Sequence, residues 1–373
     1  MSTKKQHYVP PFLLNHFACD GSQGNRINIF DMDRSEVRYN QPVRGVFSQN
    51  YFYDKDNQVE NFLATRIEGP ASSVVNKIVS GDFNIISEEL LTLHRFILSL
   101  YFRTPEASER VSGFFNSHLE SIVREGLSLN GFDPEEASAG GFQFYQDKLA
   151  SAITLNGVLD AVLLGDLEYH IIKIKNETSS EFYISDHPVF IYNWLYRKLE
   201  HHAVTSIAAI GLQIFLPVSP KITLCLYDPK VYKYGQRTSV TCISNDSDIE
   251  ILNSFQVINS DSIIGFSARE SEAHIKQLYK RYKYIKLHQY ESGMLSTKKE
   301  GKGKIRSTHF VFTRQAKLKK MPSFIQIKKK SKGYASSYQE RNPELYAKHR
   351  EFKRFISEQR QPSILELDRS ADH

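Results

Sequence analysis

The sequence is poor in the residues that build disulfide frameworks and cysteine-based metal sites. Only three of its 373 residues are cysteine, namely Cys19, Cys225 and Cys242. An odd number of cysteines without metal-ligand spacing is typical of reduced thiols in a cytoplasmic protein. Long apolar runs are also missing, because the longest, residues 207–218, is interrupted by Gln213 and is too short to cross a bilayer. We therefore expect a cytoplasmic protein with no membrane partner.

Short motifs that name a reaction are missing as well. The sequence contains no Walker loop, no Rossmann glycine pattern, no GxSxG, no HExxH and no CxxC. These gaps argue against ATP hydrolysis, α/β-hydrolase chemistry, zincin proteolysis and zinc fingers. A dispersed metal site, of the kind that many nucleases use, leaves no short motif, so the sequence is compatible with one.

Charge is present in abundance but is unevenly distributed. Residues 291–373 hold 20 Lys and Arg against 9 Asp and Glu, whereas residues 1–290 hold 28 against 33. A basic region attached to a mildly acidic body is typical of a polyanion-binding protein, although a merely solubilising surface has the same composition. The lysines that we expect to contact phosphates are Lys317, Lys319, Lys320, Lys328, Lys329 and Lys330.

Apolar patterning predicts an α+β fold. Helical periodicity is found at residues 57–80, 87–103, 106–126, 134–164, 246–259, 270–282 and 343–359. Strand patterns are found at 26–30, 36–40, 169–175, 181–185, 210–218, 222–227 and 262–268, and we expect 169–175 to pair with 181–185. The predicted layout is a helical N-terminal half packed on a mixed or antiparallel sheet from the second half. We expect one domain, residues 1–290, followed by a basic C-terminal extension, residues 291–373.

The chain opens with an ordered stretch, QHYVPPFLLNHF at residues 6–17. Pro10 and Pro11 hold the residues before them extended, and Pro11 is well placed to begin a short helix with an apolar face. His7 is therefore fixed rather than mobile. It is either a structural histidine with satisfied hydrogen bonds or a functional one.

The stretch SDHPVF, residues 185–190, follows a predicted strand. Strand alternation places Asp186 and His187 on opposite faces, so they should not both bind one metal ion. Asp186 is the better candidate for a functional carboxylate. The alternative is a turn in which Asp186 accepts hydrogen bonds from backbone amides.

Further candidates lie on the first two long helices. Glu60 and Glu68 are roughly 12 Å apart on an unbroken helix, so only one of them can join a compact site with His7. Gly69-Pro70 is expected to kink or break that helix. Arg103 ends the next helix, where it either complements the helix dipole or clamps a phosphate or carboxylate. His94, within the same helix, is expected to be a hydrogen-bonded core histidine.

Several motifs in this order resemble a known family. They are Gln6-His7-Tyr8-Val9-Pro10, Gln49-Asn50-Tyr51-Phe52-Tyr53, Glu60 and Glu68, Arg103-Thr104-Pro105, Ser185-Asp186-His187-Pro188 and Leu216-Pro217-Val218-Ser219-Pro220-Lys221. Over roughly residues 6–285 the sequence is similar to the bacterial group called domain of unknown function 4238, which usually has Asn where His16 and His187 stand here. The resemblance implies no particular activity. It makes His7, Glu68, Arg103 and Asp186 the candidates for a catalytic site, because they lie within the matching motifs.

Three functional hypotheses follow. In the first, the protein is a metal-dependent nuclease that acts as a bacterial toxin or defence effector. His7, Glu60 and Asp186 would then bind Mg²⁺ or Mn²⁺, and Arg103 would hold a phosphate of RNA or DNA. In the second, the protein binds RNA or DNA through its basic extension without cleaving it. In the third, it is an interaction or sensor component, and HYVP and SDHP are purely structural.

Overall fold

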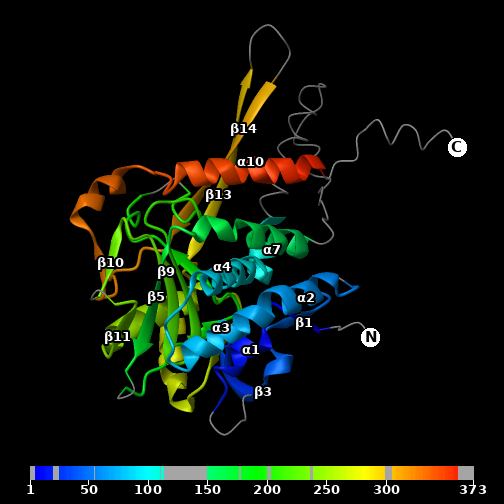
Figure 1. Ribbon diagram of the computed structural model, residues 1–373. Coiled ribbons are helices and arrows are strands. Elements are labelled where there is room, and N and C mark those ends of the chain that lie inside the picture. The colour runs from blue at the N-terminus through cyan, green and yellow to red at the C-terminus, as the bar shows by residue number, and fades with distance from the viewer. Residues whose placement is uncertain are drawn as a thin grey trace, which may run out of the picture.

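Two sheets run through the molecule and combine strands from both halves of the chain (Figure 1). The computed structural model describes residues 5–19, 25–53, 55–109, 111–112, 149–175, 178–199, 203–235, 238–298 and 305–359, without the side chains of 149, 290–313 and 357–359. The five-stranded sheet has the order β11-β5-β9-β8-β7. Its strands are β5 (Glu168–Ile174), β7 (Phe190–Tyr192), β8 (Gln213–Ser219), β9 (Ile222–Tyr227) and β11 (Val240–Ile243). Only β11 and β5 run parallel among these pairs.

The second sheet corrects the expected layout while the α+β class is confirmed. It is antiparallel, with the order β3-β2-β12-β6. Its strands are β2 (Arg26–Asp31), β3 (Glu36–Pro42), β6 (Ile184–Ser185) and β12 (Ile263–Phe266). Two further strands of the first half, β1 (Lys5–His7) and β4 (Ser48–Asn50), pair with each other. Strands thus occur throughout the chain, and both halves contribute to one sheet.

The expected pairing of residues 169–175 with 181–185 is also wrong. β5 lies between β9 and β11, while β6 pairs with β12. Ile171, Ile172 and Ile174 of β5 are fully buried. A strand that is apolar on successive residues needs neighbours and cover on both faces, which a local hairpin cannot supply.

One group of helices stacks on one side of the sheets. The first group consists of α1 (Pro11–Asn15), α2 (Gln58–Phe62), α3 (Gly69–Val79), α4 (Ser87–Phe102) and α7 (Leu149–Asp160). In Figure 1, α2 with α3, then α4 with α7, then α10 (Pro343–Gln359) lie one above another. Two more helices, α8 (Asp246–Asn259) and α9 (Glu272–Tyr282), contact each other. The helix expected at 106–126 lies largely outside the described residues. Of the helix expected at 134–164, the described part forms α7 and a 3-10 turn, Ala161–Leu164. No described helix is long and apolar enough to cross a membrane.

A π-helix, Leu63–Glu68, joins α2 to α3 without the break expected at Gly69-Pro70. The Gly69 amide donates to the Ala64 carbonyl, five residues back. The apolar residues Val59, Leu63, Ile67 and Ala71 are spaced by four, a stripe that would drift by about 40° per step on an α-helix. The wider π turn offsets this drift and keeps the stripe against the core. π segments of this kind are frequent at functional sites.

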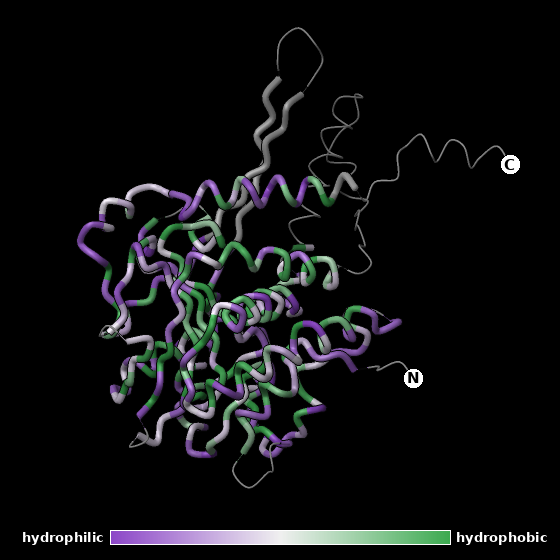
Figure 2. Tube along the Cα trace, viewed as in Figure 1, coloured by the Kyte–Doolittle hydropathy of each residue, from purple (hydrophilic) through white to green (hydrophobic). Residues whose placement is uncertain are grey.

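The buried core is apolar and rich in aromatic rings. Figure 2 shows apolar residues gathered along the central strands and the inner helix faces. Around α4 the buried residues include Leu93, Phe96 and Leu100. On the other side of the five-stranded sheet, the ring of Phe190 stacks on Phe215 and Phe255 at 4.8 and 4.7 Å. Dense packing on both faces makes these sheets a rigid frame.

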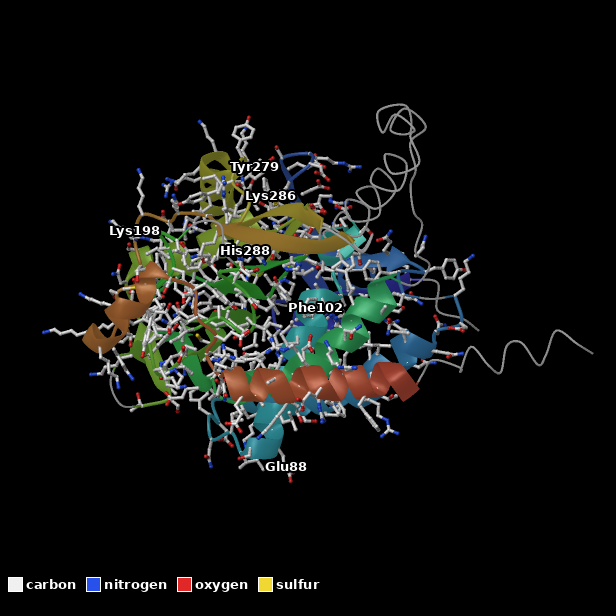
Figure 3. All side chains as sticks on the ribbon, turned by 90° about the horizontal axis from the view of Figure 1, so that it is seen from above. Glu88, Phe102, Lys198, Tyr279, Lys286 and His288 are labelled. Carbon is white, nitrogen blue, oxygen red and sulfur yellow. The ribbon has the colours of Figure 1, made fainter. Side chains whose placement is uncertain are left out.

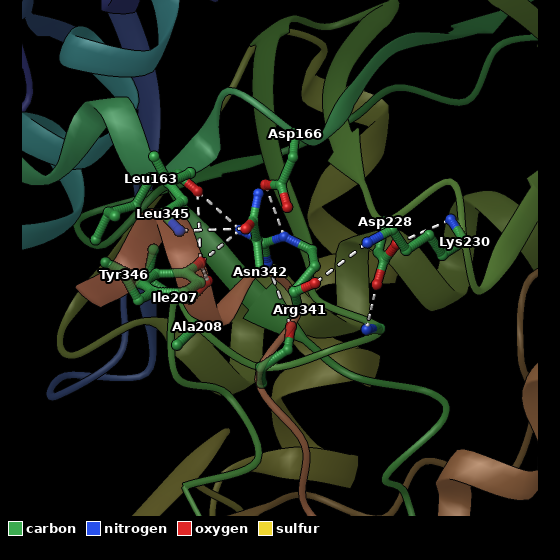
Figure 4. A network of polar contacts seen from close by, with 12 residues as sticks. Leu163, Asp166, Ile207, Ala208, Asp228, Lys230, Arg341, Asn342, Leu345 and Tyr346 are labelled. Atoms are coloured by element: carbon green, nitrogen blue, oxygen red, sulfur yellow. Dashed lines mark hydrogen bonds and ion pairs between the residues drawn. The ribbon is translucent and has the colours of Figure 1, made fainter. Parts of the chain in front are cut away.

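The C-terminal extension packs on the body. Its strand β15 (Ile325–Ile327) pairs with β10 (Tyr232–Tyr234), and Phe324 and Ile325 are buried with the core. Arg341 is 3% exposed and donates from Nε to Asp166 and from Nη2 to the Leu163 carbonyl and the Tyr346 hydroxyl (Figure 4). The boundary at residue 290 stays a prediction, but the described part of the extension is bound to the rest.

One element projects from the body. Strands β13 (His288–Lys298) and β14 (Ile305–Gln315) form an antiparallel hairpin that extends well beyond the sheets (Figure 1). At its root, His288 lies opposite Gln315, and Gln289 lies opposite Arg314. The hairpin therefore brings residues 288–289 and 314–315 together where it joins the rest of the molecule.

Candidate functional site

The structure brings three of the predicted site residues together. Arg103, at the end of α4, is 0% exposed, and its Nη1 lies 2.6 Å from Oε1 of Glu68. Burial lowers the pKa of His7 below its ordinary value; Glu68 opposes this shift and Arg103 adds to it. The π-helix ends at Glu68. The ion pair therefore joins the end of the π-helix to the end of α4.

Tyr53 completes this cluster. Its hydroxyl donates to the His7 carbonyl at 3.2 Å, and burial raises the pKa of its phenol. The charge of Glu60 raises the pKa of both Tyr53 and Arg103, so its carboxylate lies on the same side of the molecule as that of Glu68. Sequence reasoning missed Tyr53, although it stands in the stretch Gln49-Asn50-Tyr51-Phe52-Tyr53 that carries the family resemblance.

Several polar atoms of the cluster are buried without a hydrogen bond. Within the described part of the chain, His7 Nε2, Arg103 Nε and Arg103 Nη2 have no hydrogen-bond partner. Arg341, in contrast, uses Nε, Nη1 and Nη2. Nε and Nη2 form the edge of a guanidinium that binds oxyanions side-on, which is the chemistry expected of Arg103. These atoms are closed to solvent in this conformation.

Asp186 does not join the cluster. Its carboxylate accepts five hydrogen bonds from the loop before β12, from the amides of Asp261, Ser262 and Ile263 and the hydroxyls of Ser260 and Ser262, at 2.7 to 3.0 Å. Burial raises its pKa, and these donors oppose the shift. The carboxylate thus fixes a loop, but one distant in sequence rather than the turn that follows it.

His187 points to a different neighbour, as strand alternation predicted. Its Nδ1 is hydrogen-bonded to the Thr104 hydroxyl and lies 3.7 Å from the Glu106 carboxylate. The residues that follow Arg103 and the residues that follow Asp186 are therefore in direct contact. The two motifs meet through Thr104 and His187, both of which are buried.

The expected Mg²⁺ or Mn²⁺ site stays a prediction. Across the residues that the structure describes, no group of three or more His, Cys, Asp and Glu side chains could hold a metal ion. His7 and Glu60 lie on the side of Arg103, whereas the oxygens of Asp186 are bound to the loop at 260–263.

A second candidate site lies at the root of the β13–β14 hairpin. It is a pocket of about 300 Å³. Four cationic side chains line it, and no carboxylate is among its described lining residues. They are Arg197, Lys286, Arg314 and Lys317, with Tyr284 and Gln289 beside them. Figure 3 looks down on this end of the molecule, where Lys286 and His288 lie close together.

Local contacts hold two of these cations in place. The Arg197 guanidinium lies over the Trp194 ring, 5.9 Å from its centroid, and its Nη1 is 3.5 Å from the Leu318 carbonyl. Lys286 Nζ is 3.8 Å from a carboxylate oxygen of Asp261, which neutralises part of its charge. Asp261 itself lies outside the described lining of the pocket. Arg314 and Lys317 also interact with neighbouring groups.

The predicted lysines are only partly gathered here. Lys317 lines the pocket. Lys319, Lys320, Lys329 and Lys330 are exposed, and Lys328 is bonded to the Pro229 carbonyl. Sequence reasoning missed the other lining residues, Arg197, Tyr284, Lys286 and Arg314. The alternation of basic and aromatic residues in RYKYIK, residues 281–286, was the pattern that could have revealed two of them.

Comparison with known proteins gives one match. A family model described as "Protein of unknown function (DUF4238)" matches residues 5–270. Searches of curated proteins and of solved structures give no match. The matched residues include His7, Glu68, Arg103 and Asp186, whereas Tyr284 and Lys286 lie beyond them. Because the model covers most of the chain, the protein belongs to the DUF4238 family of proteins of unknown function.

Proposed function

We propose that this protein binds RNA or DNA through the basic pocket at the root of the β13–β14 hairpin. The observation that carries the proposal is the lining of this pocket, with four cationic side chains and no carboxylate among its described residues. Cations gathered in a concave surface focus the electrostatic potential and attract a polyanion from solution. Phosphate groups neutralise such cations and release counterions, which supplies much of the affinity for nucleic acid.

The composition of the surrounding chain supports the same ligand class. Residues 291–373 are strongly basic, and the hairpin that rises from the pocket belongs to this region. Arg197 and Arg314 offer planar groups that match phosphate geometry, while Lys286 and Lys317 act as point charges. A nucleic-acid strand could follow the pocket and continue along the hairpin.

The proposal is limited to binding. The carboxylate of Asp186, the expected metal ligand, already accepts five hydrogen bonds within the protein. Replacing them with a metal ion would leave buried backbone amides without acceptors. Metal-dependent cleavage therefore stays a separate prediction.

Binding of a fluorescently labelled oligonucleotide, followed by anisotropy at several salt concentrations, tests the proposal. The test variant replaces Lys286 and Lys317 with Gln. The matched control replaces Lys276 and Lys348 with Gln, which removes the same charge from two exposed lysines that each pair with a nearby glutamate. We expect the pocket variant to bind at least tenfold more weakly than the control. For a single strand, its slope of log affinity against log salt should be smaller by about 1.4, at about 0.7 per lost phosphate contact.

Two results would overturn the proposal. One is an unmodified chain that binds no oligonucleotide even at low salt. The other is equal weakening in the pocket variant and its control, because that would assign the affinity to net charge rather than to this pocket.

A further inference from the structure

We infer that the pocket takes single-stranded nucleic acid, with a base stacked on Tyr284. This inference rests on the proposed function and specifies its substrate class. Tyr284 lines the pocket together with the four cations. Its side chain is 87% exposed, whereas the other large hydrophobic residues that are exposed range from 37% to 58%.

The surroundings of the ring suit a nucleobase. Lys283 Nζ lies over one face of the ring, 4.7 Å from its centroid. Further cations line the pocket beside it. Ile285, the next residue, is 41% exposed and lines the same pocket. An aromatic platform bordered by phosphate-binding cations is the common arrangement in single-strand binding proteins.

Duplexes cannot use this platform in the same way. Their bases are already stacked and paired, so reaching the ring would require a base to leave the helix. Every base of a single strand offers a face to the ring, which makes the contact tolerant of sequence. Both forms of nucleic acid can make phosphate contacts with Arg197 and Lys286. Tyr284 is therefore the residue that should separate the two forms.

The test compares one sequence as a single strand and as a duplex, with the full chain and three variants. Tyr284→Ala removes the platform, and Tyr284→Phe keeps the ring without the hydroxyl. Phe355→Ala is the matched control, because this residue is another exposed aromatic, 58% exposed, on α10 and away from the pocket. We expect Tyr284→Ala to weaken single-strand binding by about 5- to 150-fold, the range of one lost stacking contact. Duplex affinity and the salt slope should not change, and Tyr284→Phe and Phe355→Ala should match the parent.

The outcomes separate this inference from the proposed function. If Tyr284→Ala binds single strands as well as the parent, or loses duplex binding equally, stacking on this ring is wrong while the basic pocket stands. Loss of binding in Tyr284→Phe would also overturn it, because the hydroxyl would then be the binding group. A parent chain that binds neither form would overturn the proposed function itself.

Discussion

Asp186 uses both of its carboxylate oxygens to hold the loop that leads into β12. Three of its five donors are the backbone amides of consecutive residues, 261 to 263. The side chain is 3% exposed, so water does not compete for these bonds. In this arrangement a carboxylate stabilises a buried turn by accepting from every donor that faces it.

Replacing Asp186 with Asn should therefore destabilise the fold. One carboxylate oxygen becomes an amide group, whose N–H faces backbone N–H groups that need an acceptor. We expect the free energy of unfolding to fall by about 3 kcal/mol or more. Urea unfolding followed by circular dichroism measures this change. Asp33→Asn, at an exposed position, should change stability by less than about 0.5 kcal/mol. An Asp186→Asn variant as stable as the parent would return this carboxylate to the candidates for metal binding.

At the scale of elements, local patterns predicted the long helices and single strands well. α8, α10 and β9 begin and end at the residues that their periodicity indicated. Pairing was not predictable in the same way, because β12 pairs with β2 and β6 across sequence separations that only tertiary packing decides. The π-helix also needed the tertiary context, since it keeps a four-residue stripe against the core.

The two candidate sites differed in how far the sequence revealed them. Glu68 and Arg103 were found through motifs in one continuous part of the chain. The basic pocket was found only in the structure, because Arg197, Lys286 and Arg314 come from three distant segments. Nothing local marks such residues as neighbours until the strands around them are placed.

Docking of β15 predicts that the basic extension unfolds together with the body. Ile325 is 2% exposed within the core cluster that includes Phe190 and Phe255. Ile325→Ala should lower the free energy of unfolding by about 2–5 kcal/mol. Thermal unfolding should remain one transition. Ile285→Ala, which truncates a 41% exposed side chain, is the control and should have a much smaller effect. A separate early transition for Ile325→Ala would contradict joint unfolding and support a boundary at residue 290.

At the scale of the whole molecule, buried histidines link stability to pH. Burial lowers the pKa of His94 to about 4, and it lowers the pKa of His170 to about 4 as well. His94 Nε2 is buried without a hydrogen-bond partner in the described chain, so the expected hydrogen bond is not found at that atom. No described group at this atom stabilises the protonated imidazole. Unfolded histidine takes up a proton near pH 6.5. The stabilisation from a neutral buried histidine is therefore present above pH 6.5 and is lost as the pH falls toward 4.

His94→Leu should flatten this dependence. Between pH 7 and pH 4.5 the parent loses roughly 2–3 kcal/mol of unfolding free energy through His94 alone, because the unfolded chain binds a proton there and the folded chain does not. Burial raises the pKa values of Asp186 and Glu181, so these two groups stabilise the folded protein as the pH falls. The contribution of His94 is therefore the difference between the stability lost by the parent and the stability lost by the variant. Urea unfolding at the two pH values gives the four free energies required. Between the two pH values the parent should lose roughly 2–3 kcal/mol more unfolding free energy than the variant. Any effect of leucine on packing is present at both pH values and cancels from this difference. Equal losses in parent and variant would show that His94 already binds its proton in the folded protein, and the acid sensitivity would then have to come from other groups.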